Sequence, residues 1–235
     1  MSRIVVTGAS SGIGRATALL LAKDGHALVL TSRQEDKLRA LADSCLVAGA
    51  ASVSVVAADI ADPDTAPQLA DAVGMSGEGE IALVNNAGVA MFGSFDKMPI
   101  EDSIKMVRVM LEGTMRATHA LLPAMLTASR GTVVNVLSIA VLHTFAGSEG
   151  YSAAKYGLLG FAKSLSQSYR RQGLRVTNVI PGSTDTQLWD AIESPPARDD
   201  MLTAEAVAQT IKMVIDAPRD RSYDEIVVTP PKGVL

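Results

Sequence analysis

The sequence predicts an α/β fold, namely a doubly wound, mostly parallel sheet of seven strands with helices on both faces. Two observations predict it: short runs rich in Val, Ile and Leu alternate with longer helical stretches, and a glycine-rich turn follows the first run. We find no internal repeat and no break in composition that would divide the chain. We therefore expect one domain over residues 1–235, with a substrate loop around 186–201.

The elements follow from runs of five or six residues that are apolar at consecutive positions, which predicts strands buried on both faces. The expected strands are Arg3–Thr7, Ala27–Thr31, Ser52–Ala57, Ile81–Asn85, Thr132–Leu137, Arg175–Ile180 and Glu225–Thr229. The expected helices are Ile13–Asp24, Glu35–Ala48, Asp64–Val73, Ile100–Ala128, Tyr151–Gln172 and Thr203–Asp216. The fourth of these is long enough to be two helices. Residues 186–201 are either a plain surface connection or a mobile cover for a substrate.

Composition narrows the functional class. The 235 residues are 48% hydrophobic and 20% charged, with a net charge of −4 and no block of Lys or Arg, so a nucleic-acid partner is not expected. One cysteine, Cys45, excludes an internal disulfide and fits a reducing compartment. No segment suggests a signal peptide or a membrane span. We expect a cytoplasmic protein that does not bind membranes.

A glycine-rich turn, Thr7-Gly-Ala-Ser-Ser-Gly-Ile-Gly14, joins the first strand to the first helix. Gly8 allows a tight turn, Gly12 lets the backbone approach a pyrophosphate, and Gly14 lets the helix pack on the strand. The spacing differs from the dinucleotide fingerprint Gly-x-Gly-xx-Gly, so the position of the turn carries more weight than its pattern.

The end of the second strand predicts the choice of cofactor. NAD-binding sheets place an acidic residue here for the ribose hydroxyls, whereas this chain has Ser32 followed by Arg33. Arg33 could pair with a 2′-phosphate, and Ser10 and Ser11 could donate hydroxyls to it. NADP(H) is therefore expected, with NAD(H) as the alternative, unless Arg33 is a solvated residue at a strand end.

Two further strand ends carry polar residues. Asp59 follows the third strand and could accept from the adenine amino group, but a helix-entry role competes evenly with this. Asn85-Asn-Ala-Gly88 closes the fourth strand, at the edge where open α/β sheets bind ligands.

Tyr151 and Lys155 are four residues apart on a predicted helix, so their side chains share one face. A free phenol has a pKa of about 10, and a nearby ammonium is expected to lower it, which suits a general acid and base. Ser138 ends the fifth strand and could hydrogen-bond a substrate oxygen. A Tyr-xxx-Lys pair alone is common; these three residues downstream of a glycine turn predict carbonyl–alcohol chemistry.

Together these motifs resemble the short-chain dehydrogenase/reductase family over nearly the whole chain. The resemblance implies a Rossmann-type fold, catalytic roles for Ser138, Tyr151 and Lys155, and a nicotinamide carboxamide held after the sixth strand by the Thr184 backbone and the Thr186 hydroxyl. The cofactor-binding residues that it and the turn chemistry predict are Thr7, Gly8, Ser10, Ser11, Gly12, Ile13, Gly14, Ser32, Arg33, Asp59, Ile60, Asn86, Ala87, Gly88, Tyr151, Lys155, Pro181, Gly182, Thr184 and Thr186.

Met110 departs from this family's pattern. Family members carry Asn in the middle of the fourth helix, where it helps to hold a water joined to the active-site lysine. Met cannot supply an amide, so the proton relay is altered, served by another group, or impaired. Ser103 and Glu112 are nearby in sequence but are not evident substitutes.

Few other residues suggest chemistry. The three histidines are scattered and no acidic cluster has ligand spacing, so no metal is expected. His143, five residues after Ser138, and Trp189 are candidate substrate contacts, and Phe145 could be a pocket wall or an ordinary buried residue.

We therefore expect an NADP(H)-dependent oxidoreductase acting on a ketone, aldehyde or secondary alcohol, with reduction of a 3-oxoacyl thioester as one specific possibility. The alternative is a dinucleotide-binding sensor or structural protein that kept the fold and lost turnover. The resemblance implies a homodimer or homotetramer, built by residues 100–128 and 151–172.

Overall fold

The computed structural model describes residues 2–74, 79–192 and 195–233. Seven strands form one sheet in the order β3-β2-β1-β4-β5-β6-β7, and every neighbouring pair is parallel. This confirms the predicted doubly wound sheet, which is parallel throughout rather than mostly parallel. The strands are β1 (Arg3–Thr7), β2 (Ala27–Ser32), β3 (Ser52–Ala57), β4 (Ile81–Asn85), β5 (Gly131–Val136), β6 (Leu174–Pro181) and β7 (Glu225–Val228).

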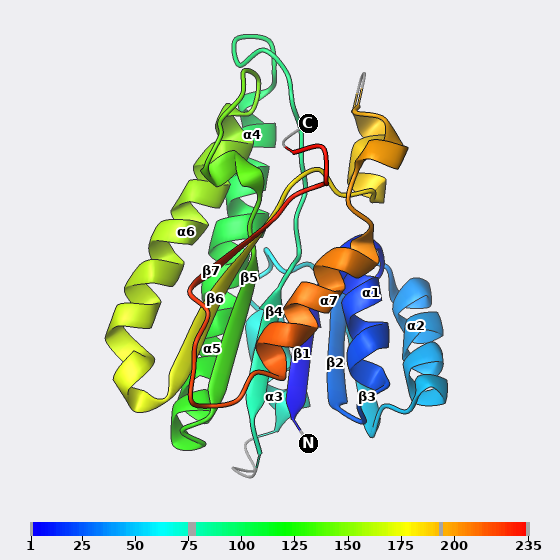
Figure 1. Cartoon of the computed structure of the whole chain (residues 1–235), viewed down its shortest axis with the longest axis vertical. Coiled ribbons are helices and arrows are strands. Elements are labelled where there is room, and N and C mark those ends of the chain that lie inside the picture. Colours follow the sequence, from blue (N-terminus) through cyan, green and yellow to red (C-terminus); the bar gives the residue numbers. More distant parts are fainter. Residues whose placement is uncertain (1, 75–78, 193–194, 234–235) are drawn as a thin grey trace.

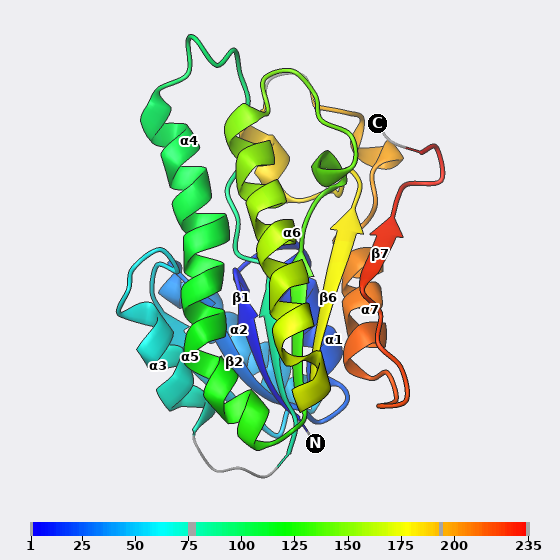
Figure 2. The same cartoon turned by 90° about the vertical axis from the view of Figure 1, so that its left-hand side faces the viewer.

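Helices cover both faces of the sheet, as Figures 1 and 2 show. One face carries α1, α2 and α7, and the other carries α3, α4, α5 and α6, each over its own apolar core. Their bounds are α1 (Gly12–Ala22), α2 (Glu35–Ala48), α3 (Thr65–Val73), α4 (Ile100–Val107), α5 (Gly113–Thr127), α6 (Glu149–Tyr169) and α7 (Ala204–Ile215). The strand order reverses between β1 and β4, and in such sheets ligands bind outside the carboxyl ends of the strands at this point.

The long fourth helix is neither one regular helix nor two separate ones. A π-helical turn at Arg108–Glu112 joins α4 to α5 without a break. Such turns insert one residue into a helix and are frequent at functional sites. This turn contains Met110, the residue that departs from the expected pattern.

Burial on both faces was predicted for every strand, and this is wrong for the two edge strands. In β3 the side chains of Ser52, Ser54 and Ala57 are exposed, and in β7 Val227 is 50% exposed. The helices of each layer pack over the middle of the sheet, so an edge strand is covered less completely than a central one.

A buried ion-pair network closes the amino-terminal edge of the sheet. Arg175 in β6 is buried, and its Nη2 lies 3.2 Å from Glu80 Oε1. Arg219 and Thr132 also contact Glu80, at 2.6 and 2.7 Å. Because this edge is opposite to the carboxyl ends of the strands, we interpret the network as structural.

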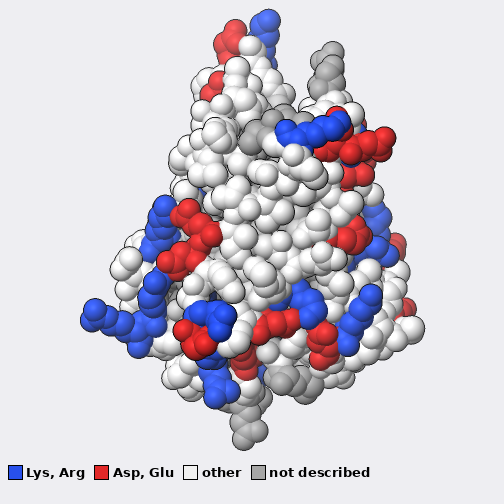
Figure 3. All heavy atoms as spheres, in the orientation of Figure 1, with Lys and Arg blue, Asp and Glu red and all other residues white. Residues whose placement is uncertain are grey.

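Charged side chains of both signs are interspersed on the face in Figure 3, without a continuous basic patch there. Cys45 is buried and has a free thiol. Within the described ranges, every helix is too short or too polar to span a bilayer.

Candidate active site

The glycine turn packs tightly against two other predicted motifs. Gly8 and Gly12 have φ values of +65° and +50°, which favour glycine. A Cβ at Gly8 would lie 2.8 Å from Ala87 Cα, and one at Gly12 would lie 2.9 Å from Thr186 Cγ2. Helix α1 begins at Gly12, and its N-cap Ser11 makes no side-chain capping bond. The backbone N–H groups at the start of α1 are therefore free to bind an anion.

A cavity of about 470 Å³ lies beside this turn. Three basic side chains reach it from different segments: Arg15 from α1, Lys37 from α2 and Arg198 from the segment after β6. A helix N-terminus, a glycine-rich turn and the basic side chains of Arg15 and Lys37 together fit the phosphates of a dinucleotide. The residues lining the cavity are Ser10, Ser11, Gly12, Arg15, Lys37, Asp185, Thr186, Gln187, Asp190 and Arg198.

Sequence reasoning missed Arg15 and Lys37. The sequence pointed instead to Ser32 and Arg33. Arg33 is exposed and is not part of the cavity lining. The Ser32 hydroxyl accepts a hydrogen bond from Gln34 N at 3.2 Å. The signal for Lys37 was its place four residues after Arg33, in the first turns of the helix that follows the same strand.

The side chains of Thr7 and Asn86 bind the protein itself. Thr7 Oγ1 accepts from the backbone N–H groups of Asn86 and Ala87, both at 3.0 Å. Asn86 Nδ2 donates to the carbonyls of Thr7 and Gly8, at 2.9 and 3.2 Å. These bonds fix the ends of β1 and β4 side by side. Gly88, at the end of this segment, is exposed.

A row of buried asparagines crosses the sheet and was not foreseen. Asn85 Nδ2 donates to Asn135 Oδ1 at 3.0 Å, and Asn135 Nδ2 donates to Asn178 Oδ1 at 3.2 Å. The three residues share one register on β4, β5 and β6. The sequence showed one Asn in each of three predicted strands. Only the register of these strands, which the sequence does not give, aligns the three side chains.

Asp59 takes part in the turn that leads into α3. Its Oδ1 accepts from Ala61 N at 3.0 Å, and its carbonyl accepts from Thr65 Oγ1 at 2.6 Å. The carboxylate therefore stabilises the turn before α3, and its contact with an adenine stays a prediction. Ile60 is buried, with its carbonyl 2.7 Å from where a Cβ on Gly113 would lie.

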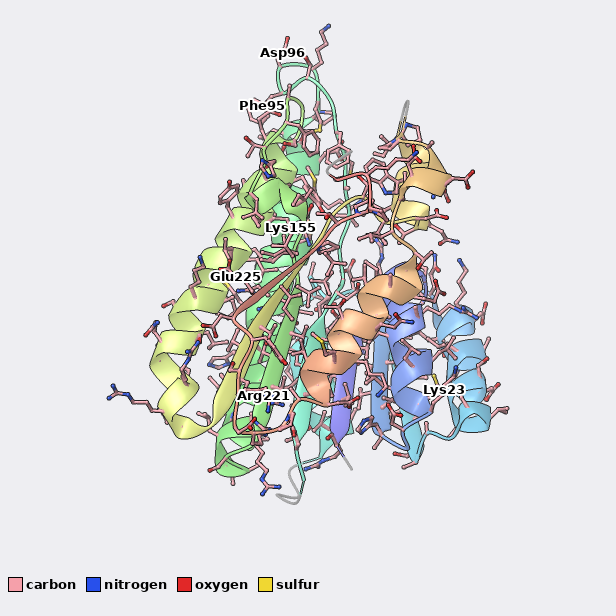
Figure 4. The ribbon with its side chains drawn as sticks, in the orientation of Figure 1. Lys23, Phe95, Asp96, Lys155, Arg221 and Glu225 are labelled. Carbon is pink, nitrogen blue, oxygen red and sulfur yellow. The ribbon has the colours of Figure 1, made fainter. Side chains whose placement is uncertain are left out.

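Ser138, Tyr151 and Lys155 come together at the carboxyl end of β5. The Tyr151 and Ser138 hydroxyls are hydrogen-bonded, and Ser138 Oγ also accepts from Ala140 N at 3.2 Å. Lys155 Nζ lies 5.7 Å from the centre of the Tyr151 ring and donates to Val136 O at 2.8 Å. Figure 4 labels Lys155 on α6. The predicted four-residue spacing thus places an ammonium beside a phenol.

Burial sets the protonation of this pair. It raises the pKa of Tyr151 above 10, and the hydrogen bond from Ser138 only partly offsets it. Burial also lowers the pKa of Lys155 from 10.5 to about 8. The expectation that the pKa of Tyr151 lies below its usual value is therefore not met, because desolvation of the phenol dominates in this structure.

Met110 lies against the active-site segment after β4. It is 1% exposed, and a Cβ on Gly88 would lie 3.6 Å from its sulfur. Glu112 pairs with Arg116 at 2.6 Å, and Ser103 lies against Gly150. Neither neighbour supplies the amide that Met110 lacks.

The segment after β6 is held by its own backbone and by one indole. Gly182 N donates to Val228 O at 2.8 Å, next to Pro181 at the end of β6. Thr184 Oγ1 donates to Gly182 O at 3.0 Å, and the Thr184 carbonyl accepts from Trp189 Nε1 at 3.0 Å. Thr186 lies against Gly12, between the glycine turn and the predicted substrate loop.

The predicted substrate loop contains two short 3₁₀ helices, Gln187–Ala191 and Arg198–Asp200; residues 193–194 lie outside the described ranges. Arg198 donates to Asp185 Oδ1 at 2.5 Å, Thr186 O at 2.9 Å and Asp190 Oδ1 at 2.7 Å. Figure 1 shows the loop above the carboxyl ends of the strands. Of the two substrate candidates, Trp189 is half-buried and His143 is exposed.

One acidic cluster lies away from this site. Ligand atoms of Asp24, His26 and Asp216 come within 4.8 Å of one another. Lys212 pairs with both carboxylates, at 2.6 Å for Asp24. The cluster already contains its cation, and sequence spacing did not predict it.

Known proteins resemble this chain over most of its length. A sequence profile of short chain dehydrogenases matches residues 2–197. An oxidoreductase of Staphylococcus aureus strain N315 is 30% identical over 226 residues, which cover 96% of each chain. A metagenomic short-chain oxidoreductase solved in complex with NADP has a TM-score of 0.83 and 32% identity, covering 97% of this chain and 96% of the other. A short-chain dehydrogenase from Sphingobium yanoikuyae, solved with NADPH, has a TM-score of 0.83 and 27% identity, covering 98% and 88%.

Proposed function

This chain is an oxidoreductase of the short-chain dehydrogenase family, and we propose that it interconverts a carbonyl compound and its alcohol with NADP(H). The observation that carries the proposal is the buried Tyr151 hydroxyl, bonded to Ser138 and flanked by the Lys155 ammonium. A phenol, a hydroxyl and a cation in this arrangement can hold a carbonyl oxygen and give it a proton.

The chain's own residues would divide the work as follows. Ser138 donates a hydrogen bond to the carbonyl oxygen and orients it towards Tyr151. Tyr151 donates its proton to this oxygen as the carbonyl carbon is reduced, and Lys155 stabilises the phenolate that remains. The nicotinamide, when bound, supplies the hydride. In the reverse direction the phenolate takes the alcohol proton.

Basic residues around the adenosine end favour NADP(H) over NAD(H). Ser32 stands where an acidic residue would repel a 2′-phosphate, and Arg33 and Lys37 lie at the end of β2 and in α2. Comparison of the Michaelis constants for NADPH and NADH tests this. Arg33→Ala should raise the NADPH value roughly 10-fold and leave the NADH value nearly unchanged, because the charge pairs with the 2′-phosphate alone. Equal wild-type values for both cofactors would refute the preference.

Two long helices supply a surface for self-association. Ile100, Ile104 and Met115 on α4 and α5, and Tyr156 on α6, are 44–53% exposed. Exposed apolar side chains on neighbouring helices mark interaction sites, which supports a homodimer or homotetramer. Light scattering after gel filtration measures the mass. A monomer at micromolar concentration would refute this part of the proposal. We also propose a cytoplasmic location, which the free thiol of Cys45 supports because it fits a reducing compartment.

Tyr151→Phe tests the central claim. The phenyl ring keeps the packing but loses the proton, so turnover of any carbonyl in a panel, including a 3-oxoacyl thioester, should fall by about 10²- to 10⁴-fold. Oxidation of NADPH is followed by its absorbance. Tyr156→Phe is the matched control, since Tyr156 lies on the same helix and is 45% exposed.

The alternative is a dinucleotide-binding sensor. Met110, buried in the π-helical turn, favours it because methionine lacks the amide of the expected proton relay. NADPH binding without turnover of any panel member would support the sensor and refute the enzyme.

A further inference from the structure

Three aromatic rings, one of them that of the proposed proton donor Tyr151, contact the ring of Phe92. The Phe92 ring centre lies 5.3 Å from that of Tyr151 and 5.3 Å from that of Phe145, with interplanar angles of 73° and 65°. The Trp189 ring centre lies 6.5 Å from that of Phe92, with an interplanar angle of 41°. We call Phe92, Phe145 and Trp189 the aromatic cluster. The pairs of Phe92 with Tyr151 and Phe145 have the edge-to-face geometry that aromatic pairs prefer.

Backbone contacts hold the cluster in place. Gly93, next to Phe92, donates its N–H to Gly147 O at 3.0 Å, and Gly147 is close to Phe145 in the chain. Gly147 has a φ of +79°, and a Cβ there would lie 3.1 Å from Gly93 O. The two segments that carry Phe92 and Phe145 are therefore joined through glycine backbones. The third ring is fixed separately by the bond from its indole to Thr184 O.

The cluster presents an apolar surface that is only partly covered. Phe145 is 47% exposed and nearby Leu142 is 45% exposed, while Tyr151 itself is buried. Partly exposed aromatic rings beside a reactive group are typical of a ligand-binding surface.

Cations close to the cluster are already engaged. Arg198, in the loop that carries Trp189, binds Asp185 and Asp190. Lys155, beside Tyr151, donates to Val136 O. Two carboxylates therefore balance the charge of Arg198, and the proposed reaction assigns the Lys155 ammonium to the Tyr151 phenolate, so neither charge is left for an anionic substituent of the substrate. An uncharged substituent fits this surface better than an anionic one.

We propose that the aromatic cluster selects uncharged ketones and secondary alcohols whose carbinol carbon bears an aryl ring, and that Phe92 determines this preference. The proposal rests on the carbonyl–alcohol chemistry proposed above for Tyr151. A substrate oxygen within reach of the Tyr151 hydroxyl brings its substituent close to Phe92, whose ring is in contact with Tyr151, Phe145 and Trp189. An aryl ring there can extend the edge-to-face packing, whereas an aliphatic ring of similar size gains area burial alone.

The chain contains a single tryptophan, Trp189, so its fluorescence reports binding at the cluster without any turnover. We would titrate the Tyr151→Phe protein with NADP⁺ present, using 1-phenylethanol, 1-cyclohexylethanol and 3-hydroxybutyrate, and follow the fluorescence of the indole. The phenyl alcohol should bind roughly 3- to 10-fold more tightly than the cyclohexyl alcohol, and the anion more weakly than both. Equal affinities for the two uncharged alcohols, tighter binding of the anion, or no saturable change with any of the three would overturn the proposal.

Phe92→Leu and Phe95→Leu in the Tyr151→Phe protein form a matched pair. Phe95 is three residues away in the same segment and 53% exposed, at the tip of the loop labelled in Figure 4. Phe92→Leu should reduce the phenyl-over-cyclohexyl ratio to about one, because Leu keeps apolar volume without a ring; Phe95→Leu should leave the ratio unchanged. If Phe92→Leu does not fold, Phe145→Leu serves instead and should lower the ratio as well. A ratio that survives loss of the ring refutes the role of the cluster.

Failure of this inference differs from failure of the proposed function. A wild-type protein that reduces acetophenone and cyclohexyl methyl ketone with equal kcat/KM is an enzyme without the proposed aryl preference. A protein that binds 1-phenylethanol selectively and reduces neither ketone supports the aromatic cluster and refutes the carbonyl reductase.

Discussion

Replacing Lys155 by Met should increase the free energy of unfolding, relative to that of the wild type, more at neutral pH than at alkaline pH. Burial lowers the folded-state pKa of Lys155 from 10.5 to about 8. Between these two values the unfolded lysine keeps a proton that the folded lysine has released, so the stability of the wild type rises with pH in this window. At 1.36 kcal/mol per pKa unit the whole effect is about 3 kcal/mol. Most of it, about 2 to 3 kcal/mol, falls between pH 7 and pH 10.

Urea unfolding of wild type and Lys155→Met at several pH values measures this effect. The free energy of unfolding of wild type minus that of the variant should increase by about 2 to 3 kcal/mol from pH 7 to pH 10. Lys163→Met is the control, because Lys163 is on the same helix, its side chain is 60% exposed and it pairs with Glu225 at the surface. The difference in unfolding free energy between wild type and Lys163→Met should be nearly independent of pH. A flat difference for Lys155→Met as well would refute a buried ammonium at this position.

Three further outcomes are expected. The kcat/KM for carbonyl reduction should fall as pH rises through about 8, because Lys155 loses the charge that stabilises the Tyr151 phenolate. The pH profile of kcat/KM measures this, and a plateau up to pH 10 would contradict it. Met110→Asn should leave steady-state turnover unchanged or raise it, since an amide replaces a thioether beside Gly88, and a lower turnover would show that no relay was missing. Glu80→Ala should destabilise the protein by about 3 to 5 kcal/mol in urea unfolding, because it leaves buried Arg175 without its carboxylate; a loss below about 1 kcal/mol would contradict the network's role.

Much of the fold could be predicted because its signals are local. Runs such as Ile81–Asn85 predicted strands whose bounds agree with the structure to within one or two residues. Tyr151 and Lys155 share a helical face by spacing alone. The burial of β3 was predicted wrongly, since an apolar run does not reveal whether its strand lies at the centre or at the edge of a sheet.

The site was predicted where one segment carries it and missed where several segments meet. The cavity brings Arg15, Lys37 and Arg198 together from three parts of the chain. No sequence pattern marks Phe92, because a lone Phe after a strand has no characteristic spacing. Its contact with Tyr151 depends on how two loops pack together. The protonation of Tyr151 also depends on burial, which local spacing does not give.

The sequence by itself determined the alternation of strands and helices, the glycine turn at residues 7–14 and the helical spacing of Tyr151 and Lys155. Each of these depends on interactions within a few residues, through backbone conformation and the helical period. The tertiary structure alone decided the asparagine row, the aromatic cluster and the low pKa of Lys155. These depend on strand register, loop closure and exclusion of water, which arise only when distant segments pack together.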